Sequence, residues 1–251
     1  MTTTGAKPPE LDQHLSYLKL LLIRDNYESL AKLAAQKQWT HIQYLAELIQ
    51  AQTHQRRDRA IERRIYQARF PQIKTLEQFN WSWPKKINQP QVRNMFRLKW
   101  IEDKNNVIFI GGVGLGKTHL ATALGYEACL KGYSVLFSTA VEAINDLTAA
   151  RAAGRLKQEL NKYLKPDLIV CDELGYLPID KTGADLLFQI ISHRYEKGSL
   201  IITTNRVFKK WPEIFNNDST LTSALLDRLL HHAETTVIEG DSYRMKEIIK
   251  T

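Results

Sequence analysis

Eight consecutive residues of this 251-residue chain have the types and spacing of a phosphate-binding loop. They match the pattern G-x-x-x-x-G-K-[ST], in which the glycines permit a tight turn that points backbone N–H groups at phosphate oxygens. The lysine of this pattern reaches the β- and γ-phosphates, and the hydroxyl that follows it binds Mg²⁺. The sequence therefore predicts a site for ATP and Mg²⁺ at Gly111, Gly112, Val113, Gly114, Leu115, Gly116, Lys117 and Thr118, with Thr118 as a metal ligand.

Two adjacent acids, Asp172 and Glu173, follow an apolar run that ends at Cys171. If that run is a strand of a parallel sheet, its carboxyl end lies at the edge of the sheet that also holds the phosphate-binding loop. Asp172 is then expected to bind the Mg²⁺ of the nucleotide, and Glu173 to polarise an attacking water. ATP hydrolysis is the predicted reaction, because a kinase for small molecules does not need this second acid.

Two further polar residues are candidate catalytic groups. Asn205 lies just after the apolar run 200–203, where an amide can orient the attacking water or contact the γ-phosphate, although Thr-Asn after a strand is also ordinary turn chemistry. Arg228 lies in an apolar helical stretch. Its guanidinium forms either an ion pair within the chain or an arginine finger that enters the site of a neighbouring subunit.

The periodicity of the sequence predicts the elements that position these groups. From Val107 onward, short apolar runs typical of buried strands alternate with helical stretches. This alternation predicts an α/β domain over residues 106–251, with a parallel sheet that helices cover on both faces. The expected strands are 107–110, 134–137, 168–171, 200–203 and 235–238, and the expected helices are 118–131, 140–153 and 184–195.

Residues 1–70 have helical spacing and predict a small, all-helical N-terminal domain. Apolar residues indicate a first helix at 11–22, a second at 27–38, and a third that begins with a Thr40 cap and ends before Pro71. On the third helix, several apolar side chains are expected to face inward. They are Tyr44, Leu45, Leu48 and Ile49 near its start, and Ile61, Ile65 and Ala68 near its end.

Residues 71–105 are predicted to form a linker that docks on the ATPase core. Prolines interrupt this segment, and Phe79, Trp81 and Trp83 alternate with polar residues, as in an extended chain. These aromatic side chains either pack on the next domain or support a nucleotide base.

The net charge of +8 is unevenly distributed along the chain. Residues 1–100 have a net charge of +9, and residues 101–251 a net charge of −1. Such an excess indicates either a polyanionic partner or a solvated basic helix face. The candidate DNA-binding residues are Arg56, Arg57, Arg59, Arg63 and Arg64, with a second basic group at Arg155 and Lys157.

Composition excludes several classes of protein. The two cysteines, Cys129 and Cys171, cannot form a disulfide framework and suit a reducing compartment. No apolar run reaches the roughly 18 residues of a membrane-spanning helix, and the N-terminal residues lack the apolar core of a signal peptide. We therefore expect a cytoplasmic protein that is not associated with a membrane.

The order of these motifs resembles the AAA+ ATPases and, more narrowly, the IstB-like transposition helper proteins, which are related to the DnaC helicase loaders. The resemblance extends from about residue 10 to the end of the chain. It rests on Ala68-Arg-Phe-Pro71, Thr75-Leu-Glu-Gln-Phe79, Gly111–Leu120, Asp172-Glu-Leu-Gly-Tyr176, Thr204-Asn-Arg206 and Gly240-Asp-Ser-Tyr-Arg244.

This resemblance implies an ATP-dependent assembly factor. Proteins of this kind form head-to-tail homo-oligomers with ATP between subunits, bind and deform duplex DNA, and recruit a partner transposase. The family lacks a C-terminal lid domain, so Arg244 is expected either to replace a lid arginine near the phosphates or to have a structural role at the surface.

Two other functions remain open at this point. A helicase loader would have the same ATPase but would act on single-stranded DNA and a helicase. A nucleotide-gated scaffold would bind ATP without turnover, and the presence of Glu173 argues against it.

Overall fold

The structure is a computed structural model that describes residues 10–245. The chain divides into two compact units, Met1–Arg63 and Arg64–Thr251. Helix α3 contributes residues to both units. None of the helices in the described residues is long and apolar enough to cross a membrane.

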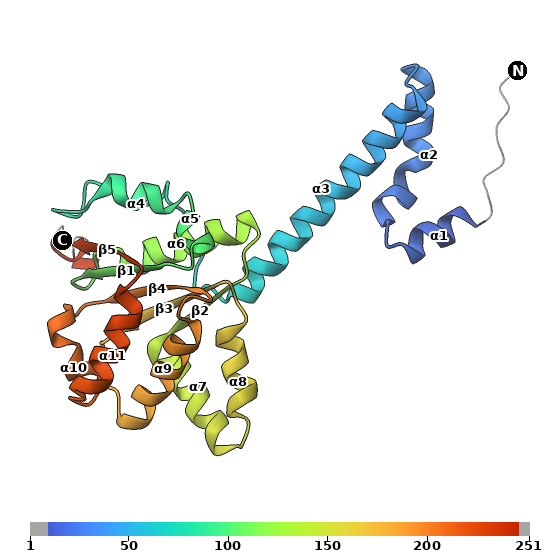
Figure 1. Cartoon of the computed structure of the whole chain (residues 1–251). Coiled ribbons are helices and arrows are strands. Elements are labelled where there is room, and N and C mark those ends of the chain that lie inside the picture. Colours follow the sequence, from blue (N-terminus) through green and yellow to red (C-terminus); the bar gives the residue numbers. More distant parts are fainter. Residues whose placement is uncertain (1–9, 246–251) are drawn as a thin grey trace, which may run out of the picture. The chain divides into compact units, whose positions relative to one another are not determined.

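The N-terminal unit is all helical, as predicted (Figure 1). It contains α1 (Leu11–Tyr17), α2 (Leu21–Gln36) and most of α3 (His41–Ala68). The backbone N–H of Gln43 donates to Thr40 Oγ1 (3.2 Å), so Thr40 caps α3 as expected. Its small core is formed by Leu15, Ile23 and Leu48.

Some details of this unit differ from the prediction. Helix α1 ends at Tyr17 rather than at residue 22. Helix α2 begins at Leu21 rather than at residue 27, and its N-cap residue forms no side-chain hydrogen bond that the sequence would reveal. Leu45 and Ile49 are 57% and 47% exposed, because only Tyr44 and Leu48 of α3 join the small core.

The second unit contains a five-stranded sheet in the order β2-β3-β4-β1-β5, and every pairing in it is parallel. The prediction of a parallel sheet is confirmed, although strand bounds differ from the expected ones by up to three residues. The strands are β1 (Asn106–Gly111), β2 (Val135–Thr139), β3 (Leu168–Leu174), β4 (Ser199–Thr204) and β5 (Ala233–Ile238).

Helices cover both faces of this sheet (Figure 1). Alternate residues of β1 show the division: Val107 and Phe109 join the core on the α6 side, and Ile108 and Ile110 join the core on the opposite side. The α6 side holds α4 (Gln89–Met95), α5 (Lys99–Glu102) and α6 (Lys117–Lys131). The opposite side holds α7 (Ala140–Ala152), α8 (Leu156–Leu164), α9 (Lys181–Arg194), α10 (Trp211–Ile214) and α11 (Ser219–Leu230).

The segment before β1 is less extended than the sequence suggested. It contains α4 and α5, and Pro90 lies in the first turn of α4, where the side chain of Asn88 caps the helix. Proline is tolerated at this position because the first turn of a helix has no partner for its N–H groups. The aromatic residue Phe79 is buried in the core on the α6 side.

Candidate nucleotide-binding site

The phosphate-binding loop connects the end of β1 to the start of α6. Gly114 and Gly116 have positive φ angles of +74° and +83°, which glycine adopts without strain. A Cβ at Gly116 would lie 2.6 Å from the ring of Phe79, so this turn also packs directly against the aromatic linker. The loop therefore requires glycine for both conformation and space.

Lys117 is held inside this loop. Its ammonium donates to the carbonyl oxygen of Gly112 (2.6 Å), and the residue is 7% exposed. Burial lowers the pKa of Lys117, while the nearby carboxylates of Asp172 and Glu173 act in the opposite direction. The side chain is thus pre-positioned beside the backbone groups that would surround phosphates.

The structure brings together Asp172 and Thr118, the two residues expected to bind Mg²⁺. The Thr118 hydroxyl donates to the Asp172 carboxylate, with oxygen–oxygen distances of 3.0 and 3.1 Å. The carboxylate is nearly fully buried, and burial raises the pKa of Asp172 although hydrogen bonds from Thr203 and Thr118 oppose that shift. A carboxylate and a hydroxyl are hard oxygen donors, which fit Mg²⁺.

Thr203 was missed by the sequence analysis. It lies on β4, the strand between β1 and β3, and its hydroxyl donates to the Asp172 carboxylate. The same oxygen accepts from the backbone N–H of Glu173 (2.9 Å). A hydroxyl residue directly after the apolar run 200–202 was the available signal for this role.

Glu173 lies at an irregularity of β3. The register with β4 shifts between Cys171 and Leu174, and Glu173 has a φ angle of +61°. A bulge with positive φ is costly for a residue other than glycine and is common at functional sites, where it re-aims a side chain. Glu173 lines two adjoining cavities.

The first cavity has a volume of about 720 Å³ and lies between the phosphate-binding loop and the linker. Lys117 and Thr118 line one side of it, and Ile73, Phe79 and Pro84 line the other. Polar groups for phosphates therefore face apolar groups suited to a base. His119, which the sequence analysis did not single out, joins the two sides because its Nε2 lies 2.8 Å from the carbonyl oxygen of Thr75.

The second cavity, of about 1090 Å³, adjoins the first at Thr118, Glu173 and Arg244. Its other walls come from β2, α7, α8 and the end of α3 with the residues that follow it. The site is therefore open on the side of the acids, where a group from outside this chain can approach.

Arg244 lies at the rim of both cavities. It belongs to a short 3-10 helix, η2 (Tyr243–Met245), and the backbone N–H of Tyr243 donates to the carbonyl oxygen of Gly114 (2.9 Å). Arg244 also contributes to the lowered pKa of Lys117. The structure thus brings Arg244 to the phosphate-binding loop.

Asn205 follows β4 directly after Thr204. Thr203 and Thr204 line the first cavity, whereas Asn205 does not. Its Oδ1 atom is buried and has no hydrogen-bond partner within residues 10–245. A buried polar atom of this kind calls for a partner that the described chain does not provide.

Arg228 is the one predicted catalytic residue that the fold places away from the loop. The neighbouring Leu229 accepts a hydrogen bond from Asn106, the first residue of β1, so this end of α11 lies at the sheet edge opposite the loop. The Arg228 guanidinium donates to the carbonyl oxygen of Ala224 (2.7 Å) and lies 5.2 Å from the centre of the Phe188 ring. Within the described part of the chain it forms no ion pair.

The candidate DNA-binding arginines lie on α3, and most of them are exposed. Helical spacing places Arg56, Arg59 and Arg63 on one face, and Arg57 with Arg64 on a neighbouring face. Arg64 is partly buried and lies near Gly132 and Cys129 at the end of α6. Arg155 and Lys157, at the start of α8, are exposed.

The sheet order, the phosphate-binding loop after β1 and the acid pair on β3 define a P-loop protein of the AAA+ class. Solved structures agree with this fold. The replication initiator DnaA bound to AMPPCP and single-stranded DNA matches with a TM-score of 0.55 and 26% identity, covering 70% of this chain and 53% of that one. The DnaC helicase loader matches with a TM-score of 0.54 and 24% identity, covering 70% and 99%. The present chain thus spans about half of the DnaA chain.

The chain belongs to the IstB-like ATP-binding proteins, whose family model matches residues 13–251. It is 41% identical over 238 residues to the putative ATP-binding protein of insertion sequence IS21 from Pseudomonas aeruginosa, covering 95% of this chain and 89% of that one. It is 34% identical to the corresponding protein of IS5376 from Geobacillus stearothermophilus, covering 94% of each chain. The resemblance noted from the motifs is thereby confirmed.

Proposed function

We propose that this protein is an ATP-dependent assembly factor of transposition, which hydrolyses ATP, oligomerises on duplex DNA and recruits or activates a partner transposase. The observation that carries the proposal is the group formed by Thr118, Asp172, Thr203 and Glu173 beside the phosphate-binding loop. It provides both oxygen donors for Mg²⁺ and a separate carboxylate that can act on water.

The proposed chemistry assigns a distinct role to each side chain. Lys117 and the loop N–H groups bind the phosphates, and Thr118 and Asp172 hold Mg²⁺, which would neutralise charge on the β- and γ-phosphates. Glu173 accepts a proton from the attacking water, and Asn205 orients that water. Arg244 adds positive charge at the rim of the site.

The position of Arg228 supports a site shared between subunits. Arg228 lies at the sheet edge opposite its own phosphate-binding loop, and the second cavity is open beside Glu173. A head-to-tail arrangement of copies would bring the Arg228 of one copy to the phosphates of the next, where a guanidinium stabilises transition-state charge.

The names of the relatives and the basic α3 helix support a role on DNA. The IS21 and IS5376 relatives are named as proteins of insertion sequences. Their names favour a transposase as the partner. The α3 arginines, together with Arg155 and Lys157, supply positive charge for binding DNA phosphates. A helicase loader remains the alternative, and stronger binding to single-stranded than to duplex DNA at equal salt would favour it.

The substitution Glu173→Gln tests the proposed reaction. We expect unchanged ATP binding and assembly, and a fall in hydrolysis of about 10²–10⁴-fold, because the amide cannot accept the proton from water. Glu127→Gln on α6, which also removes one partly buried carboxylate, is the matched control and should retain activity. Steady-state phosphate release and equilibrium binding of an ATP analogue measure the two properties separately; equal turnover by both variants would refute the role of Glu173.

A further inference from the structure

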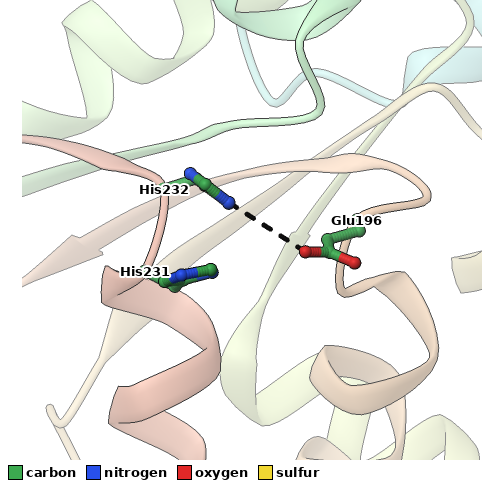
Figure 2. A group of neighbouring side chains, drawn as sticks. All are labelled: Glu196, His231 and His232. Atoms are coloured by element: carbon green, nitrogen blue, oxygen red, sulfur yellow. Dashed lines mark ion pairs between the residues drawn. The ribbon is translucent and has the colours of Figure 1, made fainter.

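A cluster of three side chains lies at the edge of the sheet opposite the nucleotide site. It consists of Glu196, His231 and His232 (Figure 2). Glu196 follows α9, His231 is the C-cap residue of α11, and His232 precedes β5. The carbonyl oxygen of His232 accepts a hydrogen bond from the backbone N–H of Asn106 (2.7 Å), which fixes this part of the cluster to the start of β1.

The geometry of the cluster suits a metal ion. One potential ligand atom from each residue lies within 4.8 Å of the others, and His232 Nε2 is 4.0 Å from Glu196 Oε1. Tetrahedral Zn²⁺ with bonds of about 2.0–2.1 Å requires ligand atoms about 3.3 Å apart. All three residues are exposed, so small rotations of their side chains can close this difference without repacking a core.

The chemistry of the donors selects a particular class of ion. Two imidazoles and one carboxylate suit Zn²⁺ and related transition metals, whereas Mg²⁺ prefers sites formed by oxygen atoms alone. The hydroxyl of Tyr195 lies 2.8 Å from Nδ1 of His231. If Nδ1 holds the imidazole proton and donates it to this hydroxyl, Nε2 of His231 is unprotonated and free to bind a metal. The carboxyl end of α11 adds partial negative charge, which favours a cation.

We propose that Glu196, His231 and His232 form a binding site for one divalent transition-metal ion of the Zn²⁺ type, with the remaining position occupied by water or by a donor from another molecule. The site is separate from the proposed ATP–Mg²⁺ site and does not depend on it. A bound ion would join the turn after α9 to the end of α11, close to Arg228 in the last turn of that helix.

Calorimetric titration of the full-length, tag-free protein with ZnCl₂ tests this proposal. We expect one Zn²⁺ per chain, with binding that an excess of Mg²⁺ does not displace. The double variant His231→Ala, His232→Ala should abolish Zn²⁺ binding. Removing a group that is hydrogen-bonded to a metal ligand typically weakens metal binding by about 10–100-fold. Glu196→Gln removes a ligand itself, so it should weaken Zn²⁺ binding by more than that. His193→Ala, which removes an exposed histidine of α9 outside the cluster, is the matched control and should bind Zn²⁺ normally.

A second measurement guards against loss of folding in the variants. Because the three side chains are exposed, the variants should keep the circular dichroism spectrum and melting temperature of the metal-free protein. Added Zn²⁺ should raise the melting temperature of the unaltered chain and of His193→Ala, but not that of the double variant. Equal Zn²⁺ stoichiometry in the double variant, or displacement by Mg²⁺, would overturn the proposal.

Discussion

Thr203 connects the two acids of the site through a single hydroxyl oxygen. This oxygen donates to Asp172 and accepts from the N–H of Glu173, which is the residue with the positive φ angle. It therefore fixes both the carboxylate expected to hold Mg²⁺ and the backbone of the proposed base. A side chain that maintains such a geometry affects turnover without touching the nucleotide.

Replacing this hydroxyl should lower ATP turnover. Thr203→Val leaves the Glu173 N–H unpaired and removes a hydrogen bond to a charged carboxylate, a change of about 1.5–3 kcal/mol that corresponds to about 10–100-fold in rate. Thr236→Val on β5 is the matched control, because the Thr236 hydroxyl is buried and has no partner within the described residues. Similar rates of phosphate release from the two variants would contradict the role of Thr203.

Asp172 also predicts an effect on stability that depends on pH. Burial raises the pKa of this carboxyl, so the unfolded chain loses the proton at lower pH than the folded chain does. The group therefore favours the folded state at pH values below the ordinary Asp pKa, and this contribution is lost as the pH rises through the raised pKa.

Asp172→Asn should accordingly raise the melting temperature at neutral pH while abolishing ATP hydrolysis. This increase in melting temperature should become smaller as the pH is lowered toward the ordinary pKa of an Asp side chain. Thermal unfolding without nucleotide or Mg²⁺ measures the effect, and Asp58→Asn, at an exposed position of α3, is the control. A lower melting temperature for Asp172→Asn at neutral pH would argue against this electrostatic explanation.

At the scale of elements, the sequence predicted the sheet more accurately than the segments around it. Buried parallel strands are short apolar runs, and each of the five was visible as such. Helices α4 and α5 were missed because prolines were interpreted as interruptions, whereas Pro90 starts a helix that Asn88 caps. The start of α2 was misplaced because no capping side chain marks it.

The same contrast holds for the candidate site. The loop glycines, Lys117, Thr118 and Asp172 could be singled out from the sequence because their spacing along the chain matches a known motif, and the structure brings them together. Thr203 and His119 could not, because their roles arise from strand order and from packing of the linker against α6. Such interactions join residues that are distant in sequence, and the periodicity of apolar residues gives no information about which distant residues meet.

The prediction of DNA binding concerns helix α3. Its face with Arg56, Arg59 and Arg63 should bind DNA phosphates, and removing each arginine–phosphate interaction should lower the slope of log affinity against log salt by about 0.9. Replacing all three arginines by Ala should therefore lower that slope by about 3. Fluorescence anisotropy with duplex DNA over a range of salt concentrations measures it.

The matched control removes the same charge elsewhere. Replacing three exposed lysines of other segments, Lys32, Lys131 and Lys197, by Ala should change the slope far less. If both triple variants reduced the slope equally, binding would depend on net charge alone. The proposed role of this α3 face would then be wrong.

At the scale of the whole molecule, the basic N-terminal region and the nearly neutral P-loop domain are expected to have different tasks. The net charge of +9 lies in residues 1–100, and the phosphate-binding loop and acids lie in the remainder, whose net charge is −1. Hydrolysis in one part would then regulate an assembly that the other part holds on DNA. Such regulation requires that neighbouring copies complete each other's sites.

Mixing two inactive variants tests this shared site most directly. In Glu173→Gln subunits the base is absent but Arg228 is intact, and in Arg228→Ala subunits the reverse holds. Each variant alone should hydrolyse ATP slowly, with the loss of the arginine finger costing about 10³-fold or more. Mixed assemblies should recover hydrolysis, because an intact Glu173 then meets an intact Arg228; activity that stays at the level of the separate variants at every mixing ratio would contradict the account.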